Sequence, residues 1–243
     1  MDKKKLDYIF CLPGHPSSGI VSEQLLACLM NLTAAGKTVS TLKAYSASVY
    51  AVRNACLGQR GFRKDQLPFQ GQYDYERLIW VDSDQIVTAE DVDRLVSHDK
   101  DIVAGWARQY STGPIDGNNY ANCGRWQLEP RVPGKSPGRN EVSHYTVDFM
   151  TGFANERAEW DIKDVLLPVD YVGMAFMVVK PGVFEKIGFP WFSGYEFEWE
   201  ENGVVMVNFM PEDADFCLKA RAAGFTVWVD PMVKSPHQKQ VLL

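Results

Sequence analysis

The sequence predicts a single α/β domain with a mainly parallel central sheet and helices on both of its faces. Three observations lead to this fold class. Predicted strands and helices alternate through the first half of the chain. Each of these strands is apolar almost throughout, which is typical of strands that are buried on both faces. The chain has 243 residues, of which 46% are hydrophobic, enough to build one large packed core.

An apolar run predicts the first strand, and leucines at helical spacing that end at a glycine predict the first helix. Residues 8–14 ("YIFCLPG") are apolar and close on Pro13 and Gly14, as expected of a buried strand that ends in a loop. The next stretch, "SEQLLACLMNLTAAG", has leucines at helical spacing. We therefore expect a helix with Ser22 as its N-cap and Gly36 as its terminator.

The following elements repeat this alternation up to the middle of the chain. Apolar runs predict the strands, and amphipathic runs predict the helices. Thr88 and Asp91 have the spacing of a capping box, which predicts that a helix begins directly after Thr88. In chain order we expect strand 37–45, helix 47–58, strand 77–81, helix 89–97 and strand 101–110.

The second half of the chain begins with a change of composition. Residues 111–161 are rich in Gly, Pro and Asn without sustained periodicity, so we interpret them as one flexible loop, hypothetically a lid. Regular structure resumes at 170–188. In 195–210 aromatic residues alternate with glutamates before an Asn-Gly pair, which predicts a small β-hairpin. A helix at 211–225 and a strand at 226–230 complete the predicted domain.

Composition excludes several classes of protein. The net charge is −6 and no long basic block is present, which argues against a nucleic acid as the partner. The five cysteines are scattered without a C-x-x-C pair, as expected for reduced packing residues of a cytoplasmic protein. The apolar run before Pro13 is too short for a signal peptide, and none is long enough for a transmembrane segment. Any membrane contact is therefore expected to be peripheral.

Two carboxylates, Asp82 and Asp84, follow the apolar strand "RLIWV" with only Ser83 between them. Ligands of parallel α/β sheets bind beyond the carboxyl ends of the strands, and on an extended chain these two side chains would point to the same side. A divalent cation such as Mg²⁺ or Mn²⁺ would relieve their repulsion. The alternative is a pair of solvated loop aspartates. An EF-hand is excluded because Val87 occupies the position that requires glycine.

A third carboxylate, Asp213, belongs to the predicted helix "PEDADFCLKARAAG". At helical spacing it falls on the same face as Phe216 and Cys217, toward the core. An inward carboxylate requires a partner or a function. Its neighbours Glu212 and Asp215 are explained more simply, because carboxylates are favoured at a helix N-terminus.

Among the histidines, only His237 has an informative context. It follows the last predicted strand in the loop "KSPH" and would matter if it completed a carboxylate metal site; otherwise it is a surface residue. We interpret His98 and His144 as surface residues.

The order of these motifs resembles the nucleotide-sugar glycosyltransferases of the GT-A fold, most closely the family 2-like members of bacteria and their viruses. The similarity is carried by "VRNA", "WVDSDQ", "DYVGMAFMVVKPGVFEKIGFPWF", "PEDADFCLKARAAGFTVWVDP" and the late histidine, and it covers most of the chain outside 111–161. It implies one Rossmann-like GT-A domain over 1–243. The nucleotide-binding half would be 1–110, and 111–243 would hold the donor sugar and the acceptor, in the host cytoplasm if the source is viral.

The resemblance also implies roles for single residues. Asp213 would be the catalytic base, with Glu212 beside it. Asp84 and His237 would bind Mn²⁺ or Mg²⁺, and Asp82 would join this metal site through a bound water or face the ribose. The residues bordering the donor would be Pro13, Gly14, Arg53, Asn54, Ser83, Gly173, Met174, Ala175 and Trp191. For Trp191, stacking on a sugar and packing in the core are both open.

The implied activity is metal-dependent transfer of a sugar from a UDP- or GDP-sugar to a hydroxyl of a carbohydrate or glycoconjugate. In a retaining enzyme Asp213 would bind the acceptor instead of acting as base. Two alternatives stay open. Haloacid-dehalogenase-like phosphatases also carry a strand that runs into D-x-D, although near the start of their domain. A glycan-binding module could keep the GT-A scaffold without turnover.

Overall fold

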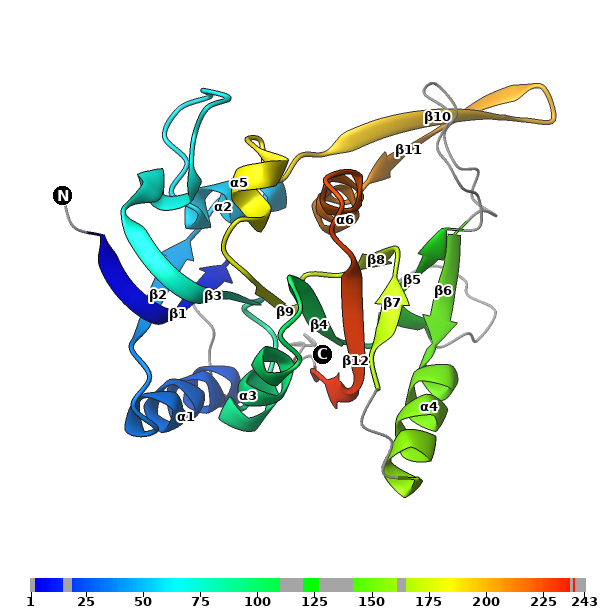
Figure 1. Cartoon of the computed structure of the whole chain (residues 1–243). Helices are drawn as coiled ribbons and strands as arrows, with labels where there is room; N and C mark the ends of the chain where they lie inside the picture. Colours follow the sequence, from blue (N-terminus) through cyan, green and yellow to red (C-terminus); the bar gives the residue numbers. More distant parts are fainter. Residues whose placement is uncertain are drawn as a thin grey trace.

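The structure, a computed structural model, describes residues 3–14, 19–109, 120–126, 142–160, 165–236 and 238. Its centre is a seven-stranded sheet in the order β2-β1-β3-β9-β4-β12-β7 (Figure 1). The strands are β1 Lys4–Pro13, β2 Val39–Ala44, β3 Tyr73–Val81, β4 Ile102–Trp106, β7 Leu167–Val169, β9 Phe176–Val179 and β12 Val227–Lys234. β2, β1 and β3 run parallel, as do β4 and β12, while β9 and β7 are antiparallel to their neighbours. The predicted α/β class with a mainly parallel sheet is confirmed.

Helices cover both faces of this sheet. In Figure 1, α1 (Ile20–Ala34) and α3 (Ala89–Ser97) lie on one face, and α2 (Val49–Cys56), α5 (Val183–Ile187) and α6 (Glu212–Ala222) on the other. The alternation of β1 explains the two layers, because successive strand side chains point to opposite faces. Tyr8 and Phe10 belong to the core under α1 and α3, whereas Ile9 and Cys11 belong to the core under α2 and α6.

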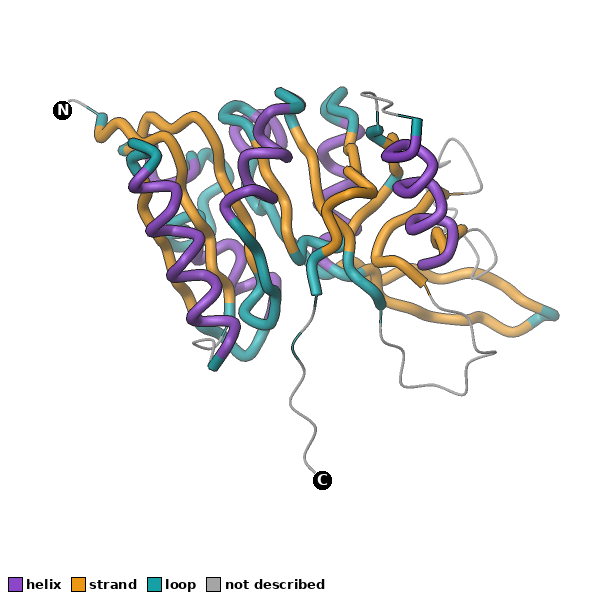
Figure 2. The backbone as a smooth tube through the Cα atoms, turned by 90° about the horizontal axis from the view of Figure 1, so that it is seen from below, coloured by secondary structure: helices purple, strands orange, loops and turns teal. Residues whose placement is uncertain are grey.

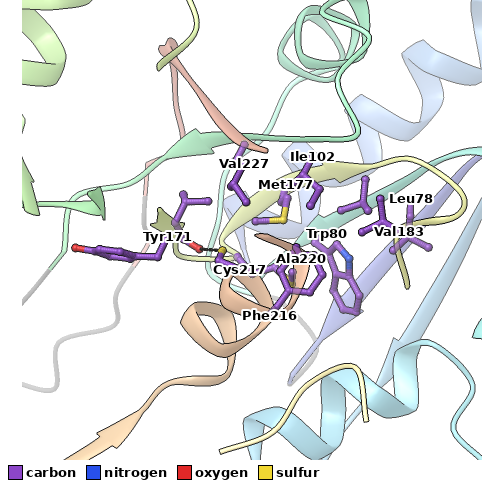
Figure 3. Packing of buried hydrophobic residues seen from close by; sticks show 14 of the residues in the cluster. Leu78, Trp80, Ile102, Tyr171, Met177, Val183, Phe216, Cys217, Ala220 and Val227 are labelled. Atoms are coloured by element: carbon purple, nitrogen blue, oxygen red, sulfur yellow. Dashed lines mark hydrogen bonds between the residues drawn. The ribbon is translucent and has the colours of Figure 1, made fainter. Parts of the chain in front are cut away.

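Aromatic packing fixes α6 against the sheet. Phe216 is fully buried and stacks on Phe184 of α5 at 5.2 Å between ring centroids. Figure 3 shows Phe216, Cys217 and Ala220 of α6 beside Trp80 of β3 and Met177 of β9. This packing matters for function because it fixes the position of the first turn of α6, which carries Glu212 and Asp213.

Two smaller sheets extend the domain. The hairpin of β10 (Tyr195–Glu201) and β11 (Val204–Met210) projects from the body in Figures 1 and 2. Its turn residues Asn202 and Gly203 have φ angles of 52° and 77°, the left-handed geometry that Asn-Gly hairpin turns adopt, so the predicted hairpin is confirmed. The other sheet has the order β6-β5-β8, with β5 Tyr120–Trp126, β6 Val142–Thr146 and β8 Tyr171–Val172.

The interpretation of 111–161 as one flexible loop is wrong for its described part. That part contains β5, β6 and the helix α4 (Val147–Glu159), which begins where the Thr146 side chain accepts a hydrogen bond from Phe149 N. Only Val147 and Met150 of this helix are buried, so it carries no apolar stripe that the sequence could reveal. β5 pairs with β6, which follows a long connection, and with β8, which is distant in sequence.

The predicted helix starts have different outcomes. α1 begins at Ile20 after Gly19, so Ser22 is not its N-cap; Ser22 lies inside the first turn. The capping box of Thr88 and Asp91 is confirmed: the Thr88 side chain accepts from Asp91 N at 3.1 Å, and the Asp91 carboxylate accepts from Thr88 N.

The 3-10 helix η1 (Pro68–Gly71) precedes β3. Within the described residues, no helix has the length and apolarity to cross a membrane.

Candidate functional site

The candidate site lies at the edge of the sheet where β1 and β3 end. Gly14 directly follows β1, has a φ of 104°, and would place an added Cβ only 3.0 Å from Ser83 Oγ. Its N–H donates to Ala44 O at the end of β2. A side chain at Gly14 would therefore be strained by its backbone and crowded by the D-x-D segment. Three strand ends meet here, where parallel α/β sheets bind their ligands.

A buried arginine connects this edge of the sheet to the helices α2 and α6. Arg53 of α2 has a side chain that is 4% exposed; its Nη2 lies 3.0 Å from Asp82 Oδ1 and its Nε lies 2.8 Å from Glu212 Oε1. The guanidinium also lies 5.8 Å from the Trp80 ring centroid. Burial disfavours its charge, but Asp82 and Glu212 outweigh burial, and the pKa of Arg53 is raised above its ordinary value. Arg53 thereby holds together α2, the end of β3 and the first turn of α6.

Asp213 is the group with the most informative acidity. It lies beside Glu212 in the first turn of α6, is half-buried, and accepts a hydrogen bond from Ala214 N at 2.7 Å on Oδ1. Burial, reinforced by the negative charge of Glu212, raises the pKa of Asp213 to about 6. Burial also raises the pKa of Asp82, against the opposing pull of Arg53. Arg53 thus pairs with two carboxylates, Asp82 and Glu212, and a third carboxyl beside them, Asp213, has a pKa raised to about 6.

The D-x-D segment is a turn, which corrects the expectation of two side chains on one side of a strand. β3 ends at Val81, and Gln85 N donates to Asp82 O at 3.1 Å, so the alternation of an extended strand does not apply. Asp82 pairs with Arg53, whereas Asp84 Oδ1 accepts from the Gln85 side chain at 3.3 Å. The two carboxylates therefore have different partners.

The segment after β12 passes along this turn. Ile86 N donates to Pro236 O at 3.1 Å, and Gln238 N donates to Asp84 O at 2.8 Å. His237, predicted as a metal ligand, lies outside the described residues. Within the described ranges, no group of three or more His, Cys, Asp or Glu residues could hold a metal ion.

Residues 173–175 line the same edge. Asp82 N donates to Ala175 O at 3.0 Å, so this segment lies beside the D-x-D turn. An added Cβ at Gly173 would lie 2.7 Å from Nδ2 of Asn122, whose Oδ1 in turn accepts from Ala107 N. Met174 and Ala175 are both buried. Asn122 had no sequence signal, because it lies in the stretch interpreted as a loop.

Asn54 and Trp191 stabilise the fold at positions where the resemblance implies donor contacts. The Asn54 amide donates to Phe192 O at 2.7 Å and to Tyr50 O at 2.8 Å, and it accepts from Phe192 N. Its hydrogen-bonding capacity is thus largely used within the protein. Trp191 is fully buried and donates from its indole to Phe184 O at 3.1 Å. A ring with no exposed face cannot stack on a sugar, so the core interpretation is confirmed.

The interpretation of His98 and His144 as surface residues is wrong, because both are partly buried and each bonds a buried side chain. His144 is half-buried; its Nδ1 bonds the Tyr171 hydroxyl, and burial lowers its pKa. The His98 side chain is 16% exposed, and its Nε2 lies 2.7 Å from the fully buried carboxylate of Asp230. These partners lie 27 and 132 residues away along the chain, so no local pattern could have indicated either contact.

No protein-family model matches the chain, and no curated protein matches it in sequence. Among solved structures, the chain is similar to a crystal structure of GalNAc-T7 with UDP, GalNAc and Mn²⁺, with a TM-score of 0.51 and 11% identity. The match covers 97% of this chain but 44% of the other, so this chain spans less than half of that protein's length. At this identity the similarity concerns the fold, which is GT-A-like as predicted. The bacterial and viral family 2 type stays a prediction.

Proposed function

We propose that the protein is a glycosyltransferase that moves a sugar from a UDP- or GDP-sugar to a hydroxyl of a carbohydrate or glycoconjugate. The single observation that carries this proposal is the half-buried Asp213, with a pKa of about 6, beside an ion-pair network at the ligand-binding edge of the sheet. The GT-A-like fold supports the same conclusion.

Asp213 is suited to take the proton of the acceptor hydroxyl. A general base works best when its pKa is near the working pH, and burial brings Asp213 toward that range. Glu212 is the neighbouring carboxylate, and its ion pair with Arg53 keeps it in place, so that its charge helps to maintain the raised pKa of Asp213. Asp213 would instead orient the acceptor if the reaction retains configuration.

Arg53 is proposed as the residue that positions the site. It holds Asp82 on one side and Glu212 on the other, and its Nη1 is buried without a hydrogen-bond partner among the described residues. A buried donor of this kind is costly unless something satisfies it. An oxygen of a bound nucleotide would do so, and Pro13, Gly14 and Ser83 would border the same nucleotide.

Asp82 and Asp84 are the carboxylates that would hold a hard divalent cation. Mg²⁺ and Mn²⁺ sites that act on nucleotides use one or two carboxylates, with waters and phosphate oxygens filling the other positions. Asp84 would be the main ligand because the Asp82 carboxylate already pairs with Arg53. His237 stays a proposed third ligand. When bound, the cation would supply Lewis-acid stabilisation of the charge that develops on the departing diphosphate.

The fold also bears on the alternatives. The D-x-D strand β3 is the third strand along the chain and the whole sheet is GT-A-like, which favours transfer over a haloacid-dehalogenase-like phosphatase. An inactive glycan-binding module would not need a carboxyl of raised pKa beside a buried ion-pair network.

The experiment is a thermal-shift and hydrolysis screen of UDP- and GDP-sugars, each with and without Mn²⁺ or Mg²⁺. At about 100 times Kd, binding adds about 2.7 kcal/mol to stability, which raises Tm by about 5 to 11 °C for a chain of this size. We expect this shift to depend on the metal, with slow sugar release. A generic phosphate ester serves as the control substrate. Ester hydrolysis without any nucleotide-dependent shift would contradict the proposal.

A further inference from the structure

A surface loop between α2 and η1 presents an aromatic side chain to solvent. The segment 59–67, which we name the Phe62 loop, follows α2 and projects from the body in Figure 1. Phe62 is 89% exposed, the largest exposure of any large hydrophobic side chain among the described residues, and Leu67 is 49% exposed. Exposing a phenylalanine this fully costs solvation free energy, which a binding partner would recover.

The loop is held in one shape by its own polar side chains. Gln66 Oε1 accepts from Arg60 N at 2.7 Å, and Gln66 Nε2 donates to Arg63 O at 3.0 Å and to Gly61 O at 3.3 Å. Gln59 Nε2 also donates to Gly61 O at 2.9 Å. The turn around Phe62 is therefore pre-organised, and binding through it would require little additional ordering.

The charge of the loop is opposite to that of the whole protein. It contains Arg60, Arg63 and Lys64 against Asp65 alone, so three positive charges and one negative charge leave +2, compared with −6 for the chain. Arg63 pairs with Asp65, whereas Arg60 and Lys64 are exposed and make no ion pair within the described part of the protein. Two unpaired cations thus flank the exposed ring.

Further cationic side chains lie at the same edge of the sheet, at the start of β1. Lys4 N donates to Gln72 O at 3.1 Å, which places the start of β1 beside the residues that follow the Phe62 loop and η1. Lys3, Lys4 and Lys5 are exposed, although Asp74 lies opposite Lys5 across the β1–β3 pair. The amino end of β1 therefore adds cations near the Phe62 loop, although Asp7, Asp74 and Glu76 at the same ends of β1 and β3 offset most of their charge.

We propose that the Phe62 loop is a peripheral docking element for an anionic lipid surface, with Phe62 inserted at the headgroup level and Arg60 and Lys64 against the lipid phosphates. An apolar side chain that enters the headgroup region and cations that meet the lipid phosphates both contribute to binding at an anionic surface. A protein partner is less suited, because two exposed apolar side chains fall far short of the roughly 800 Å² per partner of a stable interface. This proposal goes beyond the proposed catalytic function and does not depend on it.

The position of the loop leaves the candidate site accessible. The loop lies near the amino ends of β1 and β3, whereas Asp82 follows the carboxyl end of β3. The nine residues of β3 span about 30 Å at the rise of an extended strand. A membrane-docked protein would therefore keep the carboxylate edge facing the surrounding solution.

The test is vesicle co-sedimentation of the purified full chain. Wild type should bind vesicles of phosphatidylcholine and phosphatidylserine, bind pure phosphatidylcholine much less, and lose binding as salt is raised. Phe62→Ser should weaken binding by about tenfold or more, the usual scale for one buried aromatic side chain. Arg60→Gln with Lys64→Gln should also weaken binding, and the remaining binding should respond less to salt.

Two variants outside the loop serve as matched controls. Phe209→Ser removes a phenylalanine that is 67% exposed on the β10–β11 hairpin, and Arg125→Gln removes an exposed cation on β5. Both should bind vesicles as wild type does, and circular dichroism should show that all variants are folded. The proposal is overturned if wild type ignores anionic vesicles, or if the controls lose as much binding as the loop variants. Self-association that Phe62→Ser abolishes, without vesicle binding, would overturn it in favour of a protein partner.

Discussion

The ion-pair network around Arg53 leads to the sharpest prediction about stability. Arg53→Met keeps most of the side-chain volume but removes the charge. The buried carboxylate of Glu212 and the partly buried carboxylate of Asp82 then lose their shared partner. Removing one member of a buried ion pair typically costs about 3 to 5 kcal/mol, because the remaining charge is desolvated and unpaired. We expect a loss within this range and, for a chain of this length, a Tm lower by about 6 to 20 °C.

The assay is urea denaturation of wild type and Arg53→Met at several pH values. Burial already raises the pKa of Asp82, and in the variant it loses the opposing pull of Arg53, so its folded-state pKa would lie further above that of the unfolded chain. Stability would then be greatest below the unfolded pKa and fall as pH rises through the folded pKa, so the deficit of Arg53→Met should shrink from pH 7 toward pH 5. Adding Glu212→Gln to Arg53→Met should restore part of the loss, because one unpaired charge is removed.

The matched control is Arg63→Met, which breaks the exposed pair with Asp65. Exposed ion pairs contribute little to stability, so this variant should unfold like wild type. The reasoning about Arg53 is refuted if Arg53→Met is no more destabilising than Arg63→Met, or if its deficit is the same at every pH.

Three further predictions concern the carboxylates and the tight packing beside them. Asp213→Asn should reduce sugar transfer by about a hundredfold or more while donor binding stays intact. Wild-type transfer should fall below pH of about 6, as Asp213 takes up a proton, and pH–rate profiles of the asparagine variant should lack this step. Asp84→Ala should abolish the part of the nucleotide-induced rise in Tm that depends on the metal. Nucleotide titrations with and without metal would check this. Gly173→Ala should cost about 1 to 3 kcal/mol in urea denaturation, because its Cβ would lie 2.7 Å from the Asn122 amide; an unchanged midpoint would show that Asn122 moves freely.

The parts of the fold that were predicted depend on local patterns. Thr88 and Asp91 mark the start of α3 because a capping box involves only four consecutive residues. Asn202 and Gly203 mark the hairpin turn because the left-handed backbone restricts which residues fit there. Neither prediction required knowledge of any distant contact.

The missed features have no local signal. β9 runs antiparallel between β3 and β4, but a buried strand has the same apolar sequence in either direction. α4 buries only Val147 and Met150, so it lacks the periodicity by which helices are recognised. Asn122 became relevant only when β5 packed beside Gly173.

The sequence by itself determined the chemistry available to this protein: a carboxylate pair after a buried strand and further carboxylates in the first turn of a helix. It selected Asp213 as the inward one, whereas Glu212 and Asp215 are the more buried in the structure. Tertiary structure alone decided how these groups differ. Arg53 lies 29 residues from Asp82 and 159 residues from Glu212, yet it bonds to both. Acidity depends on burial and on the charges nearby, and both are set by which distant segments pack together. Hence Asp82 is paired by Arg53, while Asp213 acquires a pKa of about 6.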